Sequence, residues 1–159
     1  MECKHFIFVA AGGAFGSVLR TWLWDVLRGG FPWSTIAVNV AGSFLIGVLF
    51  HILGNDEDNM NLRFFLIAGF CGGFTTFSTF SLDVLKLFRD GHAWLALGNV
   101  ALSLVCCLIA VFAGWVVSKQ VLADEIQFSA PWQFSLWHGL IKGLLPLAIL
   151  VILISGLAG

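Results

Sequence analysis

Charged residues are scarce in this chain. Only 11% of its 159 residues are Asp, Glu, Lys or Arg, whereas 59% are hydrophobic and the mean hydropathy is +0.96. A soluble domain usually carries about a quarter charged residues. This composition excludes a water-soluble globular protein. We therefore predict an all-α integral membrane protein whose solvent is the lipid bilayer.

Tyrosine is absent, and the four cysteines form no CxxC pair. Three of them, Cys71, Cys106 and Cys107, fall in hydrophobic stretches, where a thiol behaves as a small apolar group. The four histidines are scattered along the chain rather than clustered. The sequence therefore predicts no disulfide framework and no metal site built from histidine or cysteine.

Long uncharged stretches predict four transmembrane helices, at residues 6–26, 33–53, 64–82 and 93–118. A fifth candidate at residues 132–157 contains Lys142 and Pro146, and we expect it to be a peripheral membrane helix. These stretches divide the chain into a four-helix membrane domain at residues 1–120 and a linker with an extra hydrophobic helix at residues 121–159. The loops leave no room for a soluble catalytic module, so we expect no enzyme.

Basic residues are shared almost evenly between the two sides of the predicted membrane domain. Three lie on the side of the N-terminus and three on the other side (Lys4, Arg63 and Lys119; Arg28, Lys86 and Arg89). Because an excess of Lys and Arg normally marks the cytoplasmic side, this near-tie barely specifies an orientation. A chain that inserts in both directions can form an antiparallel dimer around a two-fold axis in the membrane plane.

The third stretch contains the motif "GFCGGFTTFSTFS", residues 69–81, which is poor material for a smooth helix. The pair Gly72-Gly73 predicts a helix break inside the membrane. A break frees backbone carbonyls, which are tolerated only when they are buried in protein or line a cavity or ion site. Freed carbonyls are hard oxygen ligands that suit a small cation.

Phe77 and Phe80 follow the break and share a helical face. The edge of a phenyl ring is positive, so two such edges in a narrow passage can contact a small anion that has lost its water. Hydroxyl donors lie nearby at Thr75, Thr76, Ser78 and Thr79. Phenylalanine pairs are usually packing, but their coincidence here with glycines and hydroxyls favours a site.

Two further polar residues lie inside predicted spans. Asn39, in the second span, either forms a hydrogen bond that joins two helices or donates a hydrogen bond to a passing polar species. Arg20, near the end of the first span, reaches the interface, attracts anions to a vestibule, or does both. The residues alone leave both alternatives open.

The motifs "GGAFGSVLR", "WSTIAVNVAGSFLIG" and "GFCGGFTTFSTFS" together resemble the Fluc/CrcB family of fluoride channels, over residues 6–118. The resemblance implies a four-helix subunit that forms an antiparallel, dual-topology homodimer. Such a dimer has two pores and exports fluoride passively across the cell membrane, which is the inner membrane in a bacterium.

The resemblance also implies roles for individual residues. The fluoride pore would be formed by Asn39, Phe77, Phe80, Ser78, Thr79, Ser103 and Arg20. The backbone carbonyls of Gly72 and Thr75 from both subunits would hold a structural sodium ion (Na+) at the dimer interface. One departure from the family stands out, because Asn99 occupies the position, four residues before Ser103, where the family usually has tyrosine.

Three other functions are weaker interpretations of the same residues. A small drug/proton antiporter needs a carboxylate in mid-membrane, but Asp25 and Asp83 lie at the ends of spans. A structural subunit leaves the helix break unexplained. An intramembrane hydrolase lacks a histidine or carboxylate placed to activate Ser78 or Ser81.

Overall fold

The computed structural model describes residues 3–27, 29, 31–54 and 59–127, with side chains described as far as residue 121. Four helices in this part of the chain are long and apolar enough to cross a membrane: Cys3–Val26, Trp33–Ile52, Met60–Arg89 and Ala93–Val121. The predicted all-helical class and its four spans are thereby confirmed. The fifth predicted helix, at residues 132–157, lies outside the described residues.

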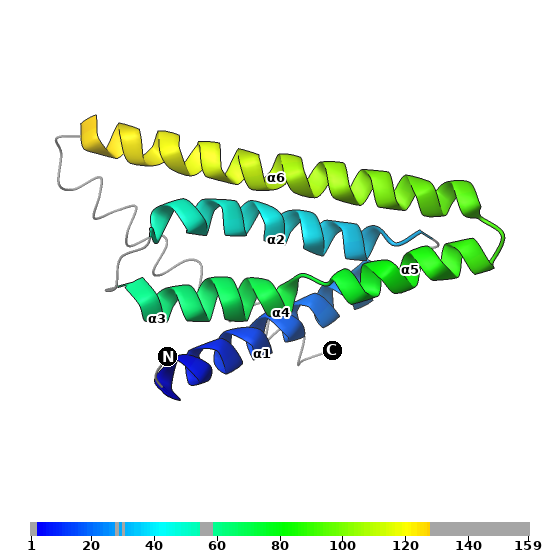
Figure 1. Ribbon diagram of the computed structural model, residues 1–159, viewed down its shortest axis with the longest axis horizontal. Coiled ribbons are helices and arrows are strands. Elements are labelled where there is room, and N and C mark those ends of the chain that lie inside the picture. Colours follow the sequence, from blue (N-terminus) through cyan, green and yellow to red (C-terminus); the bar gives the residue numbers. More distant parts are fainter. Residues whose placement is uncertain (1–2, 28, 30, 55–58, 128–159) are drawn as a thin grey trace. The chain divides into compact units, whose positions relative to one another are not determined.

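The third span is assembled from several helical pieces (Figure 1). It begins with α3 (Met60–Arg63), continues as a wider π-helix over Phe64–Cys71 and as α4 (Gly72–Phe74), and ends with α5 (Phe77–Arg89). The other spans are continuous: α1 (Cys3–Val26), α2 (Trp33–Ile52) and α6 (Ala93–Gln127). The described residues up to Lys119 belong to one compact unit, which contains every contact discussed below.

Glycine backbones bring α1 close to the third span. A Cβ atom added at Gly16 would overlap the carbonyl oxygen of Phe70, and one added at Gly73 would overlap the carbonyl oxygen of Gly13. Helices in lipid gain little from hydrophobic burial against one another, so they rely on this close backbone approach. Gly16 and Gly73 are therefore packing residues first.

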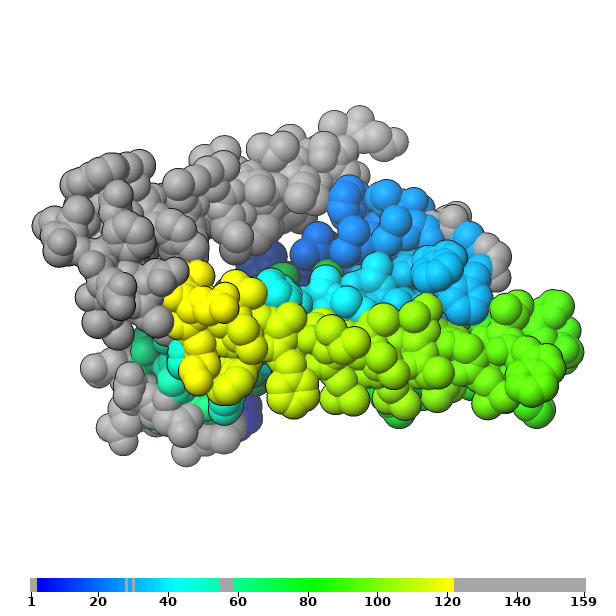
Figure 2. Space-filling view, turned by 90° about the horizontal axis from the view of Figure 1, so that it is seen from above, coloured from blue at the N-terminus to red at the C-terminus, as the bar shows by residue number. Residues whose placement is uncertain are grey.

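The same device joins α2 to α6, which lie side by side and run in the same direction (Figures 1 and 2). A Cβ atom at Gly47 would overlap the carbonyl oxygen of Val111, and one at Gly114 would overlap that of Phe44. These two contacts fix the register between the helices. Each turn of α2 consequently has a defined neighbouring turn on α6.

Large apolar side chains cover the outside of the helices. Trp94 is 86% exposed, Ile7 70% and Leu85 61% within the single chain. In water such surfaces would drive aggregation, but in a bilayer they are solvated by lipid tails. The exposure pattern agrees with the membrane assignment.

The predicted break in the third span is present, but its position at Gly72-Gly73 is wrong. Gly72 is helical, with φ −62° and ψ −39°. The chain becomes extended at Thr75 (φ −79°, ψ 157°) and Thr76 (φ −151°, ψ 109°). The reason is that Gly73 packs on Gly13 inside the helix, whereas the two β-branched threonines favour extended backbone.

Candidate functional site

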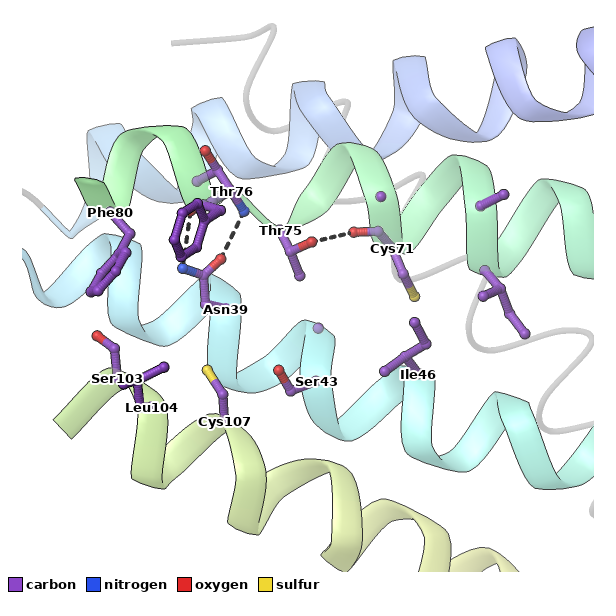
Figure 3. A pocket seen from close by; sticks show the side chains of 15 residues that line it. Asn39, Ser43, Ile46, Cys71, Thr75, Thr76, Phe80, Ser103, Leu104 and Cys107 are labelled. Atoms are coloured by element: carbon purple, nitrogen blue, oxygen red, sulfur yellow. Dashed lines mark hydrogen bonds between the residues drawn. The ribbon is translucent and has the colours of Figure 1, made fainter. Parts of the chain in front are cut away.

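A pocket of about 420 Å³ lies beside the break, between α2, the third span and α6 (Figure 3). It brings together six of the residues predicted from the sequence: Asn39, Gly72, Thr75, Phe77, Phe80 and Ser103. The other three predicted residues, Arg20, Ser78 and Thr79, do not line it. Residues from three different spans therefore meet at the one place where the third helix is interrupted.

The carboxamide of Asn39 holds the backbone of the break from α2 (Figure 3). Its Oδ1 accepts a hydrogen bond from the Thr76 N–H at 2.7 Å, and its Nδ2 donates to the Thr76 carbonyl at 3.1 Å. In an unbroken helix the Thr76 N–H would instead bond to the carbonyl of Gly72. Asn39 thus replaces the lost helical partners of Thr76, and Nδ2 keeps a second N–H.

Arg20 reaches the same break from α1. Its Nη1 donates to the carbonyl of Thr75 at 3.0 Å, and the side chain is half-buried. One turn earlier, Ser17 Oγ lies 3.4 Å from the carbonyl oxygen of Gly73. The guanidinium therefore stabilises a freed carbonyl and brings positive charge next to the break.

Thr76 also begins α5. Its hydroxyl oxygen accepts from the Thr79 N–H at 3.1 Å, which is the usual N-cap interaction. The same hydroxyl donates to Thr79 Oγ1 at 2.9 Å and lies 3.2 Å from Ser78 Oγ. Ser78 and Thr79 are thus drawn to the cap rather than to the pocket. Sequence reasoning missed this role, although a threonine directly before a helical segment is a recognisable N-cap signal.

The two phenylalanine rings are neighbours with different surroundings. Their centroids are 5.5 Å apart and the ring planes are inclined by 45°. Phe80 is only 8% exposed and forms part of the pocket wall, whereas Phe77 is 76% exposed in the single chain. The two predicted phenylalanine rings are neighbours in the structure, but only Phe80 is buried within the single chain.

Polar contacts continue one turn beyond the pocket through Thr35, Asp83 and Asn99, which the sequence analysis did not assign to the site. Thr35 donates to the Asp83 carboxylate at 2.6 Å, and Ser103 Oγ donates to Asn99 Oδ1 at 3.3 Å. The signal was available in helical spacing. Thr35 precedes Asn39 by one turn of α2, just as Asn99 precedes Ser103 by one turn of α6.

Comparisons with known proteins agree with this arrangement. The family model described as "CrcB-like protein, Camphor Resistance (CrcB)" matches residues 7–115. A relative from Rhodospirillum rubrum named "Fluoride-specific ion channel FluC" is 45% identical over 118 residues, covering 70% of this chain and 92% of the relative. A protein of the same name from Rhizobium meliloti is 44% identical over 127 residues, covering 75% and 99%. The chain belongs to the CrcB/FluC fluoride channel family.

Membership in the CrcB/FluC family confirms the resemblance seen in the sequence and the expectation of a multi-pass membrane protein. It places the chain among channels and not among enzymes, which removes the support for an intramembrane hydrolase or a drug/proton antiporter. All nine predicted site residues fall within the matched range of residues 7–115.

The hydrogen bonds of Asn39 generate a first prediction. Asn39→Ala leaves the N–H and carbonyl of Thr76 without their partners, and each such buried group costs about 1–3 kcal/mol. We expect a lower melting temperature in detergent and faster hydrogen exchange at the Thr76 amide. Ser43→Ala is the matched control, because Ser43 lines the same pocket one turn further along α2. Equal melting temperatures in the two variants would contradict the bracing role of Asn39.

Proposed function

We propose that this protein is a passive, fluoride-selective channel that exports fluoride across the cell membrane. Family membership and the names of the relatives support the choice of ion. The structural observation that carries the proposal is the extended segment Thr75–Thr76, which opens beside a pocket lined by Asn39 and Phe80. A broken helix at membrane depth is tolerated where it lines a route for a polar species.

The chemistry of the pocket suits a small anion. The second N–H of Asn39 Nδ2 is a hydrogen-bond donor, and the positive edge of the Phe80 ring offers a further favourable contact. The N-terminus of α5 adds the positive end of a helix dipole, and Arg20 adds a full charge near Thr75. These groups replace part of the hydration shell of fluoride, while the pocket offers no carboxylate that would favour a cation.

A second, antiparallel copy would complete this site. Phe77 is 76% exposed and Gly72 is also exposed, although both line the pocket. An apolar ring at that position needs either lipid or a partner subunit, and lipid beside an ion path would be unfavourable. We therefore propose an antiparallel homodimer with two pores, which the balanced Lys and Arg of the two sides permit.

A structural sodium ion at the dimer axis fits the described residues in part. The carbonyl of Gly72 has lost its helical donor, because the Thr76 N–H binds Asn39. The carbonyl of Thr75 already accepts from Arg20, so a cation there would share it with a guanidinium. We propose that Gly72 and Thr75 of both subunits hold Na+, with the Gly72 carbonyl as the better ligand.

Replacing sodium by a large organic cation should weaken the dimer or lower its fluoride flux. If neither dimer stability nor fluoride flux changes, the sodium site is contradicted.

Fluoride flux is the direct test of the proposed function. Liposomes containing the purified protein should release fluoride, measured with a fluoride electrode, when a potassium ionophore clamps the voltage. Chloride release should stay at the level of empty liposomes. Equal release of the two ions, or fluoride movement that requires a proton gradient, would overturn the proposal.

The pocket ring supplies a second functional prediction. Phe80→Ile keeps an apolar side chain but removes the positive ring edge, and we expect fluoride flux to fall about tenfold, the equivalent of about 1.4 kcal/mol. Phe88→Ile is the control, because Phe88 lies on α5 outside the pocket and is 65% exposed. Wild-type flux in a folded Phe80→Ile dimer would show that the ring only packs.

Dual topology and the role of the C-terminal part can be tested together. A tag at the N-terminus, probed in sealed vesicles, should be accessible in about half of the molecules from each side, because the near-tied charge count gives no strong bias. One-sided labelling of every copy would exclude the antiparallel homodimer.

We further propose that residues 121–159 are a linker and a membrane helix outside the pores, so a chain ending at residue 120 should retain fluoride flux.

A further inference from the structure

An apolar groove of about 780 Å³ lies on another face of α2, separate from the pocket. A stripe of α2 from Trp33 to Leu45 forms its long wall, which is about 18 Å long at 1.5 Å per residue. No charged or hydroxyl-bearing side chain is among the lining residues that the structure describes. The lining outside α2 comes from α1, the third span and α6 (Leu19; Phe70 and Phe74; Leu102, Cys106 and Ala110).

The shape of the apolar groove suits a helix. Ala37 and Ala41 are exposed and lie one turn apart on α2, so another backbone can approach them closely. Phe74 is only 6% exposed and forms part of the floor, whereas Trp33, where α2 begins, is 57% exposed. In lipid, helices associate through van der Waals packing on such small residues. The groove therefore offers a helix more contact than a flat helix face does.

A matching segment follows the described part of the chain. The fifth hydrophobic stretch, residues 132–157, lies outside the described residues, and within it residues 144–154, "LLPLAILVILI", carry no polar side chain. As a helix these eleven residues are about 17 Å long, close to the length of the groove wall. Since α6 is described to Gln127, only residues 128–131 separate it from the fifth stretch.

We propose that residues 144–154 of the same chain occupy the apolar groove as a helix antiparallel to α2 and α6. The short connection supports this occupant, because successive helices joined by few residues usually become antiparallel neighbours. A segment tied to the chain also competes well with lipid tails, because its effective concentration is high. Lys142 then stays outside the groove, and its long side chain can reach the membrane surface.

The docked helix covers an aromatic stack behind the break. The ring centroids of Phe70 and Phe74 are 5.7 Å apart with an interplanar angle of 9°, and Phe74 directly precedes the extended residue Thr75. Both rings line the apolar groove, and neither lines the pocket. The extra helix is therefore a stabilising element of the third span that leaves the pocket free.

Disulfide mapping in the full-length chain tests this placement. Single cysteines are introduced at residues 147–154 and oxidised in membranes by oxygen with copper phenanthroline, which removes two electrons and two protons from each pair of thiols. Because Cys106 lines the apolar groove, links to it within one chain should form at positions three or four residues apart. Cys107 is the control, because it lines the pocket instead. The links should disappear in Cys106→Ala and persist in Cys107→Ala.

Two results of the mapping would overturn the inference. Links between two chains would show that the segment docks on a second copy. If folded protein forms no link to Cys106 at any of the scanned positions, lipid tails fill the apolar groove instead.

Thermal unfolding of the full-length chain gives a second measurement. Ala41→Leu fills the apolar groove, so it should displace the segment and lower the melting temperature by about 2–4 °C or more. Ala101→Leu is the matched control, because Ala101 is exposed on α6 and lines neither cavity. An unchanged or higher melting temperature of Ala41→Leu would contradict docking. Neither measurement depends on fluoride flux, so the outcome is independent of the proposed channel function.

Discussion

The pair of hydrogen bonds between the Asn39 carboxamide and the backbone of Thr76 is the interaction on which the rest of the site depends. A backbone that leaves the helical path inside a bilayer must find new partners for its N–H and carbonyl groups, since no lipid tail can provide them. Asn39 offers an acceptor and a donor on one rigid plane, which matches the N–H and carbonyl of a single extended residue. A serine or threonine would satisfy only part of this requirement.

The other supports of the break come from different elements, and two of them have a common geometric cause. Gly13 and Gly16 bring α1 against the backbone of the third span, and Arg20, one turn later on α1, then reaches the carbonyl of Thr75. Thr76 caps α5 from within the break itself. Close glycine packing and the arginine contact are therefore successive consequences of how α1 lies along the third span, whereas the cap is local to α5. Loss of the close approach at Gly16 would also withdraw the arginine.

Hydropathy was sufficient to locate the four spans, because a helix that crosses a bilayer needs a long run of apolar residues, and few other structures contain such a run. The meeting of Asn39, Phe80 and Ser103 at one pocket was also predictable, although only through resemblance to a family, since nothing in their spacing specifies which helices become neighbours. The position of the break was not predictable. A glycine pair signals both backbone freedom and close packing, and the contact between Gly73 and Gly13 decides in favour of packing. The side chain that replaces the helical hydrogen-bond partners of Thr76, that of Asn39, lies on a different span.

The division of hydrogen-bond donors explains why so apolar a site suits an ion. Three hydroxyls near the break donate to groups of the protein: Thr76 to Thr79, Thr35 to Asp83, and Ser103 to Asn99. Other groups that suit an anion are amide hydrogens, the edges of phenyl rings and the N-terminus of α5. Amide hydrogens are fixed in direction by the bonds their carbonyl oxygens accept, whereas hydroxyl hydrogens rotate. In the proposed channel, donors of fixed direction between apolar rings would hold a small anion at defined positions and would offer a larger, more weakly hydrogen-bonding anion little in return for its lost water.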